Sequence, residues 1–510
     1  MEKTVTIRAH KALFLNTLAF TVCFASWMLN GVLVTFLSSN RVFDWGPTEI
    51  GWLIGIPVLT GSLFRLPAGM LTDKYGGKPI YGILLIVSAL PMFLLSGADS
   101  FWTYAMYSAG FGLAGTSFSV GIAYTSVWYP QSWQGTALGI FGAGNAGSAL
   151  TTLFAPTLLN HLTDNGANLE GWRDLPVYYA AMLVIMGVLL FIFADNKKPD
   201  KKGASFREQL LPLKDVRVWR FGLYYFLVFG CFVAFSQWLV PYFVNVYYLP
   251  LVTAGILASL FSFPSGVIRA IGGWLSDYFG ARQVMYWVLG LSAVLSFFLI
   301  VPKMDVYSPG AGVTAFRAGT VTEVSDTFVV VDDYRYQIKE NERAGENLED
   351  QMLVFPTRLT WQEPAVTVGQ QVKRNTLLAK GVTRIHFQAH VWVFSGLVVI
   401  LGTVWGIGKA AVYKHIPNYF PDEVGVVRGI VGVIGGLGGF VCPIVFAYLL
   451  EATGLWTSCW MLMWVISVIS LIWMHQVIQN MLRDEHPKAM QHFETGSGAE
   501  RVSGAEQAEY

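Results

Sequence analysis

The stretch RLPAGMLTDKYG at residues 65–76 and the stretch RAIGGWLSDYFG at residues 269–280 can be aligned without a gap. Each begins with an arginine and carries glycine, leucine, aspartate and glycine at the same later positions, 204 residues apart. A repeat at this distance in a chain of 510 residues indicates two related halves.

The composition around this repeat is that of a membrane protein. Hydrophobic residues make up 54% of the chain and charged residues only 13%, whereas a soluble domain carries about 25% charged residues. The net charge of +1 gives no reason to expect a nucleic-acid partner. The four cysteines are scattered singly through apolar stretches, so neither a disulfide framework nor a metal site is predicted. We also expect no cofactor and no enzymatic activity.

Apolar stretches long enough to cross a bilayer recur along the whole chain. A helix needs about 20 apolar residues to cross a hydrocarbon core about 30 Å thick. We therefore expect an all-α polytopic membrane protein with 12 transmembrane helices in two six-helix halves. The expected spans are residues 12–37, 49–72, 79–97, 101–127, 134–160, 176–194, 219–245, 251–275, 283–301, 387–414, 426–450 and 454–480.

The spans and the polar stretches between them predict the organisation of the chain. We expect an N-terminal six-helix bundle at residues 1–194, a cytoplasmic linker at 195–218, a C-terminal bundle at 219–304 and 386–481, an inserted β-rich domain at 305–385, and a disordered cytoplasmic tail at 482–510.

The distribution of lysine and arginine predicts the orientation. These residues are concentrated in the 195–218 linker, in the loop DKYGGKP at 73–79 and near both termini, and the opposite short loops nearly lack them. Because cytoplasmic loops are enriched in Lys and Arg, both termini are expected in the cytoplasm of a multi-pass cytoplasmic (inner) membrane protein.

The 305–385 segment does not read as a membrane segment. Its strand-like runs GTVTEVS, TFVVVDDYRYQIK and LLAKGVTRIHF are separated by turn residues, which predicts a small β domain on the outer side. The run VTVGQQVKRNTLLAKG resembles the strand pairs of barrel-sandwich carrier domains. No attachment lysine for lipoate or biotin is evident, so no cofactor is carried over.

The two arginines of the repeat are expected deep in the membrane. Arg65 and Arg269 each lie eight residues before the loop aspartate, which places them about 12 Å inside by helical rise. A midplane arginine costs at least about 2.5–3.5 kcal/mol and should face a cavity. No acidic partner is evident at that depth, so an anion is the expected counter-charge, and pairing with helix carbonyls is the alternative.

Other residues reach a similar depth or mark helix contacts. Phe118, Asn145, Tyr225 and Phe229 lie about 10–17 Å inside by the same count, and an amide there needs polar partners. Glycines in the spans at 134–160 and 426–450 allow close helix approach and rocking. We expect a conformational role for these glycines and for the loop aspartates that latch the helix ends: Gly142, Gly144, Gly147, Gly435, Gly436, Gly438, Asp73 and Asp277.

Together these features resemble the nitrate/nitrite porter family of the major facilitator superfamily. The family's paired arginines match Arg65 and Arg269, its glycine signatures match GIFGAGNAG and GIVGVIGGLGG, and its substrate-lining aromatic residues match Tyr225 and Phe229, with a weaker match at Phe118. The resemblance implies the major facilitator fold and a substrate-binding role for these arginines and aromatic residues. We add Asn145 to the expected substrate-binding set because of its depth and its amide. Guanidinium groups suit a planar oxyanion such as nitrate or nitrite.

The resemblance leaves several questions open. Coupling is either nitrate/proton symport or nitrate/nitrite exchange. The run GIGKAAVYKHIPNYFP is similar to that of proton-linked importers, and its Lys409 either adds a third buried charge or reaches the cytoplasm. Tyr225 and His415 are weak proton-carrying candidates. We expect a monomer in the lipid bilayer. The alternatives are a carrier for another small anion, such as an organic carboxylate, and a membrane sensor that uses the outer β domain.

Overall fold

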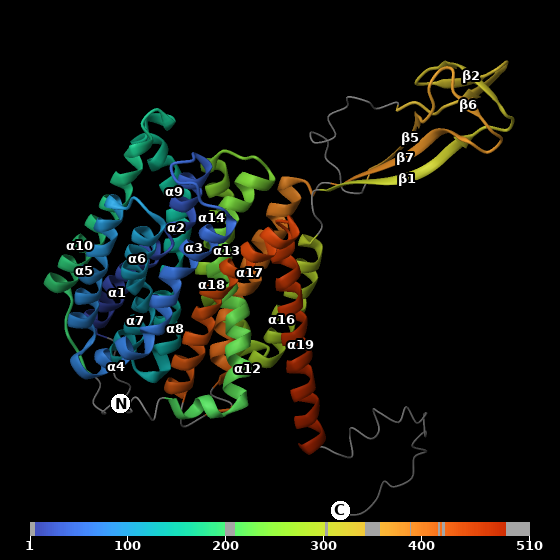
Figure 1. Cartoon of the computed structure of the whole chain (residues 1–510). Helices are drawn as coiled ribbons and strands as arrows, with labels where there is room; N and C mark the ends of the chain where they lie inside the picture. The colour runs from blue at the N-terminus through green and yellow to red at the C-terminus, as the bar shows by residue number, and fades with distance from the viewer. Residues whose placement is uncertain are drawn as a thin grey trace, which may run out of the picture.

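The computed structural model describes residues 6–198, 210–300, 304–341, 357–387, 389–416, 419–420 and 424–485. Most of these residues lie in one helical bundle, and a small β domain projects from one end of it (Figure 1). Figure 1 also shows α19 ending at the other end of the bundle, the end at which the chain begins.

The helices of the N-terminal half follow the expected spans, and several spans consist of two consecutive helices. They are α1 (Ile7–Trp27), α2 (Asn30–Ser39), α3 (Pro47–Leu63), α4 (Arg65–Tyr75), α5 (Gly77–Leu94), α6 (Phe101–Phe111), the 3₁₀ helix η2 (Gly112–Thr116), α7 (Ser117–Trp128), α8 (Gln131–Gly142), the 3₁₀ helix η3 (Ala143–Ala146), α9 (Gly147–Leu162) and α10 (Asp174–Phe193).

The C-terminal half repeats this plan and carries the β domain between α16 and α17. Its helices are α12 (Val216–Tyr225), the π-helical turn η7 (Phe226–Gly230), α13 (Cys231–Val246), α14 (Leu251–Val267), α15 (Arg269–Tyr278), α16 (Ala281–Leu299), α17 (Val391–His415), α18 (Val424–Thr453) and α19 (Ser458–Glu485). The last helix runs past 481, where the second bundle was expected to end, and residues 486–510 of the expected disordered tail lie outside the described residues.

Within the described ranges, nine helices are long and apolar enough to cross a membrane, and ten if the bent pair α14–α15 counts as one span. The spans expected at 101–127 and 134–160 fall on helices that the 3₁₀ turns η2 and η3 interrupt. Both turns contain glycine, which favours a helix less than other residues do. The expected count of twelve is therefore not reached by continuous helices alone.

Each repeat arginine follows a break in its span. Arg65 opens α4 directly after α3 ends at Leu63, and Arg269 opens α15 directly after α14 ends at Val267. In the first half Pro67 has no N–H to donate to the carbonyl of Leu63, which explains the break there. The helix ends match as well, because the last glycines of the two stretches, at 76 and 280, have positive φ values of 93° and 86°.

The segment between α16 and α17 forms two small sheets. One has the order β1 (Met304–Thr314), β7 (Leu377–Phe387), β5 (Thr357–Pro364), and the other has the order β4 (Tyr334–Gln337), β3 (Phe328–Val331), β2 (Gly319–Val324), β6 (Gln371–Val372). The three strand-like runs of the sequence coincide with β2, with β3–β4 and with β7. Val321, Val329 and Leu378 belong to a separate hydrophobic core, so the insertion is packed on its own side chains.

A basic and aromatic candidate site between the two halves

Arg65 lies in the interior with part of its guanidinium group unused. Its side chain is only 3% exposed, and Nη1 donates a hydrogen bond to the carbonyl oxygen of Gly432 in α18 at 2.7 Å. Nε and Nη2 are buried and have no hydrogen-bond partner among the described residues. Pairing with helix carbonyls therefore occupies one donor atom, while two others remain available to a ligand.

Arg269 occupies the corresponding place in the other half. Its Nη1 is also buried and lacks a hydrogen-bond partner within the described ranges. A Cβ added to Gly142 would lie 3.1 Å from Arg269 Cδ. Arg269 thus lies against α8 of the N-terminal half, whereas Arg65 lies against α18 of the C-terminal half. Each arginine contacts a glycine-rich helix of the opposite half.

Aromatic rings connect the two guanidinium groups. The Phe118 ring centroid lies 5.2 Å from Arg65 Cζ and 5.5 Å from Arg269 Cζ. Phe229 lies 5.1 Å from Arg65 Cζ and stacks on Phe118 with the ring centroids 5.9 Å apart. Cations over aromatic faces are stabilised electrostatically. The structure therefore brings Phe118 and Phe229, both expected from sequence, against the arginines.

Tyr225 completes the aromatic wall. Its ring stacks on Phe229 at 5.0 Å, and its buried hydroxyl has no hydrogen-bond partner among the residues that the structure describes. The π-helical turn η7 begins directly after Tyr225 and contains Phe229. Such turns inside α-helices occur frequently at functional sites.

Asn145 is buried in η3, but its amide is used locally. Nδ2 donates to the carbonyl oxygen of Gly142 at 2.9 Å, and Oδ1 has no partner in the described part of the chain. Asn145 therefore lies one turn beyond the glycine that contacts Arg269. Its hydrogen bond orders the helix beside the arginine instead of reaching the guanidinium group.

The site is positively charged. Among the described residues, no ion pair includes Arg65 or Arg269. Buried charges are costly unless they are paired and hydrogen-bonded. Unused donors on planar guanidinium groups match the oxygens of a small oxyanion, which they bind through charge-assisted hydrogen bonds.

Lys409 adds a third buried basic group. Its side chain is 0% exposed, so it does not reach the surface of the protein. Nζ donates to Ser265 Oγ at 2.9 Å and lies 3.0 Å from the Phe232 ring centroid. Ser265 precedes Arg269 by one helical turn, which places the amine next to the arginine site.

The glycines expected to allow rocking divide into two groups. Gly144 and Gly147 face Phe20 and Thr21 of α1, and Gly435 and Gly438 face Tyr225 and Gly230, so these four glycines pack within their own half. Gly142 and Gly436 instead face the arginines of the opposite half. A Cβ on Gly436 would lie 2.9 Å from Arg65 Nη1.

Other glycines join the two halves toward the end that carries the β domain. A Cβ on Gly55 would lie 2.8 Å from the backbone oxygen of Phe440, and one on Gly51 would lie 2.7 Å from that of Pro443. We call this contact between α3 and α18 the outer seal. Sequence reasoning missed it, although Gly51 and Gly55 form a G-x-x-x-G pattern that favours close helix packing.

The loop aspartates Asp73 and Asp277 lie near the C-terminal ends of α4 and α15. Asp277 forms a salt bridge with Lys414 of α17, in which both side chains are more than half exposed. Asp73 is partly buried in α4. Asp277 thus connects α15 to α17 within the C-terminal half.

Two aromatic residues of the site were missed in the sequence. The ring of Tyr413 lies 5.5 Å from Arg269 Cζ and meets Tyr225 edge-on at 4.7 Å. Trp27 lies 5.7 Å from Arg65 Cζ. The signal for Tyr413 was its position one turn after Lys409, whereas nothing near Trp27 in the sequence distinguishes it from the other tryptophans.

The paired halves with a buried basic site between them define a membrane carrier, and comparisons with known proteins agree. The sequence profile of the Major Facilitator Superfamily matches residues 15–324. The chain is 37% identical over 489 residues to a probable nitrate/nitrite antiporter, NarK1, of Thermus thermophilus, covering 95% of each chain. It is 26% identical over 474 residues to the nitrite extrusion protein of Bacillus subtilis (strain 168), covering 92% of this chain and 95% of the relative.

A solved structure shares the fold. The crystal structure of a bacterial homologue of the human lysosomal transporter Spinster, in an inward-facing and unoccupied conformation, superposes with a TM-score of 0.60. It has 15% sequence identity and covers 94% of this chain and 99% of its own. The chain therefore belongs to the Major Facilitator Superfamily and, within it, to the nitrate/nitrite porter family.

Proposed function

We propose that this protein carries nitrate and nitrite across the cytoplasmic membrane by alternating access, with the anion held between Arg65 and Arg269. The observation that carries the proposal is the set of buried guanidinium donors without a partner in the described residues, namely Arg65 Nε and Nη2 and Arg269 Nη1. The names of the relatives in Thermus and Bacillus support these substrates.

The geometry suits a flat anion. Nε and Nη2 of Arg65 lie on one edge of the guanidinium group, and both are without a partner in the described residues. Such an edge can donate hydrogen bonds to two oxygens of one oxyanion at the same time. Phe118 and Phe229 lie beside the guanidinium groups and confine the anion sideways. Nitrite presents the same two-oxygen edge as nitrate with one oxygen fewer, so we expect modest discrimination between the two.

The positions of the two arginines support alternating access. Arg65 bonds to α18 and Arg269 lies against α8, so an anion bound to both ties each half to the other. In this proposal the bundle has twelve spans, of which α6–α7 and α8–α9 are the fourth and fifth. Both termini face the cytoplasm.

Exchange is the coupling that the charge of the site favours. Without a bound anion, Arg65 and Arg269 would reorient with no counter-charge, which is unfavourable in a low-dielectric core. A bound anion lowers this cost, so the loaded carrier reorients more readily than the empty one. Nitrate then enters as nitrite, or another nitrate, leaves.

Proton-linked nitrate import is the second candidate, and Lys409 is the observation that favours it. Its buried amine donates a hydrogen bond to Ser265, one helical turn before Arg269, and gain or loss of a proton there changes the charge of the site. Buried lysines change protonation state readily.

Proteoliposomes loaded with nitrite, nitrate or neither test both candidates. Nitrate uptake only into anion-loaded vesicles establishes exchange, and uptake into empty vesicles driven by an inward proton gradient establishes symport. Competition by formate and acetate addresses the organic carboxylate alternative. If nitrate moves under none of these conditions and the purified protein does not bind it, the proposed function is wrong and the sensor alternative gains support.

A further inference from the structure

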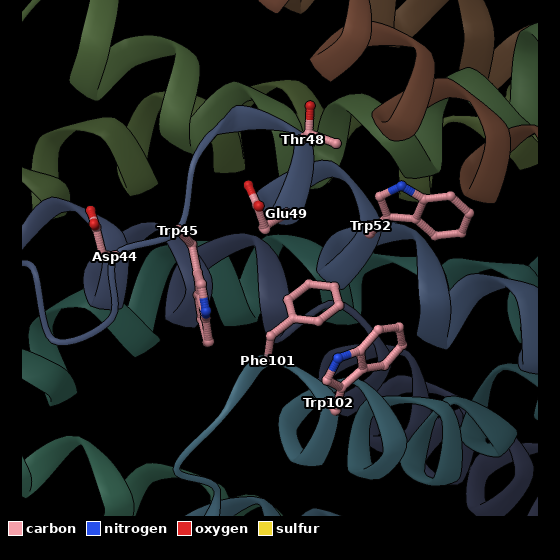
Figure 2. Close-up of a pocket in the computed structure, with 7 residues that line it drawn as sticks. All are labelled: Asp44, Trp45, Thr48, Glu49, Trp52, Phe101 and Trp102. Atoms are coloured by element: carbon pink, nitrogen blue, oxygen red, sulfur yellow. The ribbon is translucent and has the colours of Figure 1, made fainter.

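A cavity of about 470 Å³ lies away from the arginines, where α3 and α6 begin (Figure 2). This volume is typical of sites that hold small organic groups. Both helices begin at the end of the bundle from which the β domain projects. We call this cavity the outer recess, and its lining residues are Asp44, Trp45, Thr48, Glu49, Trp52, Phe101 and Trp102.

The lining of the outer recess has the chemistry of a cation site. Four of the seven residues are aromatic, two are carboxylates, and none is basic. Figure 2 shows Glu49 between Trp45 and Phe101, with its carboxylate directed away from the Phe101 ring. Neither Asp44 nor Glu49 forms an ion pair with any residue that the structure describes. Aromatic faces beside carboxylates recognise organic ammonium groups.

The aromatic residues of the outer recess are held in place by their own packing. Trp45 stacks on Phe43 with the ring centroids 4.5 Å apart and an interplanar angle of 8°, and it meets Tyr104 edge-on at 5.1 Å. Phe101 meets Trp102 edge-on at 5.3 Å. Because these rings are already ordered, little side-chain entropy is lost when a ligand binds.

The position of the outer recess points to a source for the ammonium group. Trp102 is 78% exposed at the beginning of its helix, and tryptophans at span ends lie at the level of lipid headgroups. We propose that the outer recess binds an organic ammonium group, supplied either by an aminophospholipid headgroup of the outer leaflet or by a free amine.

The outer recess also adjoins the outer seal. Thr48 donates a hydrogen bond to the Glu451 carboxylate of α18, and Trp52 meets Phe440 of the seal edge-on at 5.9 Å. The recess and the seal therefore share Thr48 and Trp52. An ammonium group in the recess therefore lies against two α3 residues that also contact α18.

Binding of tetramethylammonium to the full-length protein tests this inference. The protein is placed in phosphatidylglycerol nanodiscs, and equilibrium binding of the radiolabelled cation is measured. We expect saturable binding that weakens about tenfold in Glu49→Gln and in Trp45→Leu, because each variant removes one attractive partner of the cation. The matched controls Asp174→Asn and Trp392→Leu, at exposed positions on other helices, should bind as the wild type does.

A second arm distinguishes the source. If phosphatidylethanolamine nanodiscs prevent tetramethylammonium binding in the wild type, the lipid headgroup occupies the recess. If affinity is equal in both lipids, a free amine is the ligand. The inference is overturned if the wild type shows no saturable binding in phosphatidylglycerol, or if Glu49→Gln and Trp45→Leu bind as tightly as the wild type. Nitrate binding is measured on the same samples, so this outcome is separate from that of the transport proposal.

Discussion

Replacing Arg65 by lysine keeps the positive charge and removes the planar set of donors. In the structure Nη1 donates to Gly432, while Nε and Nη2 are buried without a described partner. A lysine ammonium group can still donate to the Gly432 carbonyl. It cannot also present the two-donor edge that we assign to nitrate.

The expected loss follows from the number of donors. A hydrogen bond to a charged group contributes about 1.5–3 kcal/mol. Because about 1.4 kcal/mol corresponds to a tenfold change in affinity, losing one such bond raises the Kd for nitrate about 10- to 150-fold. Arg269→Lys should weaken binding by a similar factor, because it changes the other side of the proposed clamp.

Nitrate binding by calorimetry, together with nitrate flux in proteoliposomes, measures this effect. Arg173→Lys is a matched control, because Arg173 also donates to backbone carbonyls, those of Ser96 and Ala98, but lies elsewhere in the N-terminal half. The control should keep wild-type nitrate affinity. Wild-type affinity in both Arg65→Lys and Arg269→Lys, with the proteins folded, would refute the clamp.

Three further changes test other parts of the structure. Gly436→Ala should lower nitrate affinity about tenfold, because its methyl group would collide with Ser62 Oγ and lie 2.9 Å from Arg65 Nη1, which displaces the guanidinium. Gly429→Ala on the same helix has no neighbour within 4 Å and should bind normally. Equal calorimetric affinities would contradict this. Residues 308 and 383 are paired with each other in β1 and β7. Replacing residues 308–383 with a Gly/Ser linker should therefore leave nitrate flux nearly unchanged. A truncated protein that folds but carries no nitrate would show that the insertion takes part in transport. Lys409→Met should abolish any proton-driven uptake of nitrate and leave exchange unchanged. Lys11→Met, at an exposed position, should change neither activity. Symport that survives Lys409→Met would exclude this amine as the proton carrier.

Several parts of the site were predictable because they depend on local properties of the chain. Helical rise counted from the loop aspartates placed Arg65 and Arg269 well inside their spans. The structure buries Arg65 and one guanidinium nitrogen of Arg269, and their depth in the membrane stays a prediction. The aromatic residues Phe118, Tyr225 and Phe229 also lie beside the arginines, as the family resemblance implied. The expected count of twelve spans was not matched by continuous helices, because the helix propensity of the residues does not show where 3₁₀ turns interrupt a helix.

Other assignments needed contacts between distant residues. Six glycines looked equivalent in the sequence, but only Gly142 and Gly436 face an arginine of the opposite half. The choice between a buried and a cytoplasm-facing Lys409 depended on Ser265, 144 residues away. Such contacts are set by how the helices pack, which local patterns do not specify.

By itself the sequence determined that this is a membrane protein of two related halves, with an arginine at the same position of each repeat and a β-rich insertion. Composition, repeat spacing and strand-like runs between turn residues are properties of the chain alone, so they can be recognised without a fold. Only the tertiary structure decided which guanidinium donors remain unused, which helices meet in the outer seal, and that an aromatic and acidic recess lies beside it. Those features arise where residues from separate helices approach one another, and packing of the whole bundle brings them together.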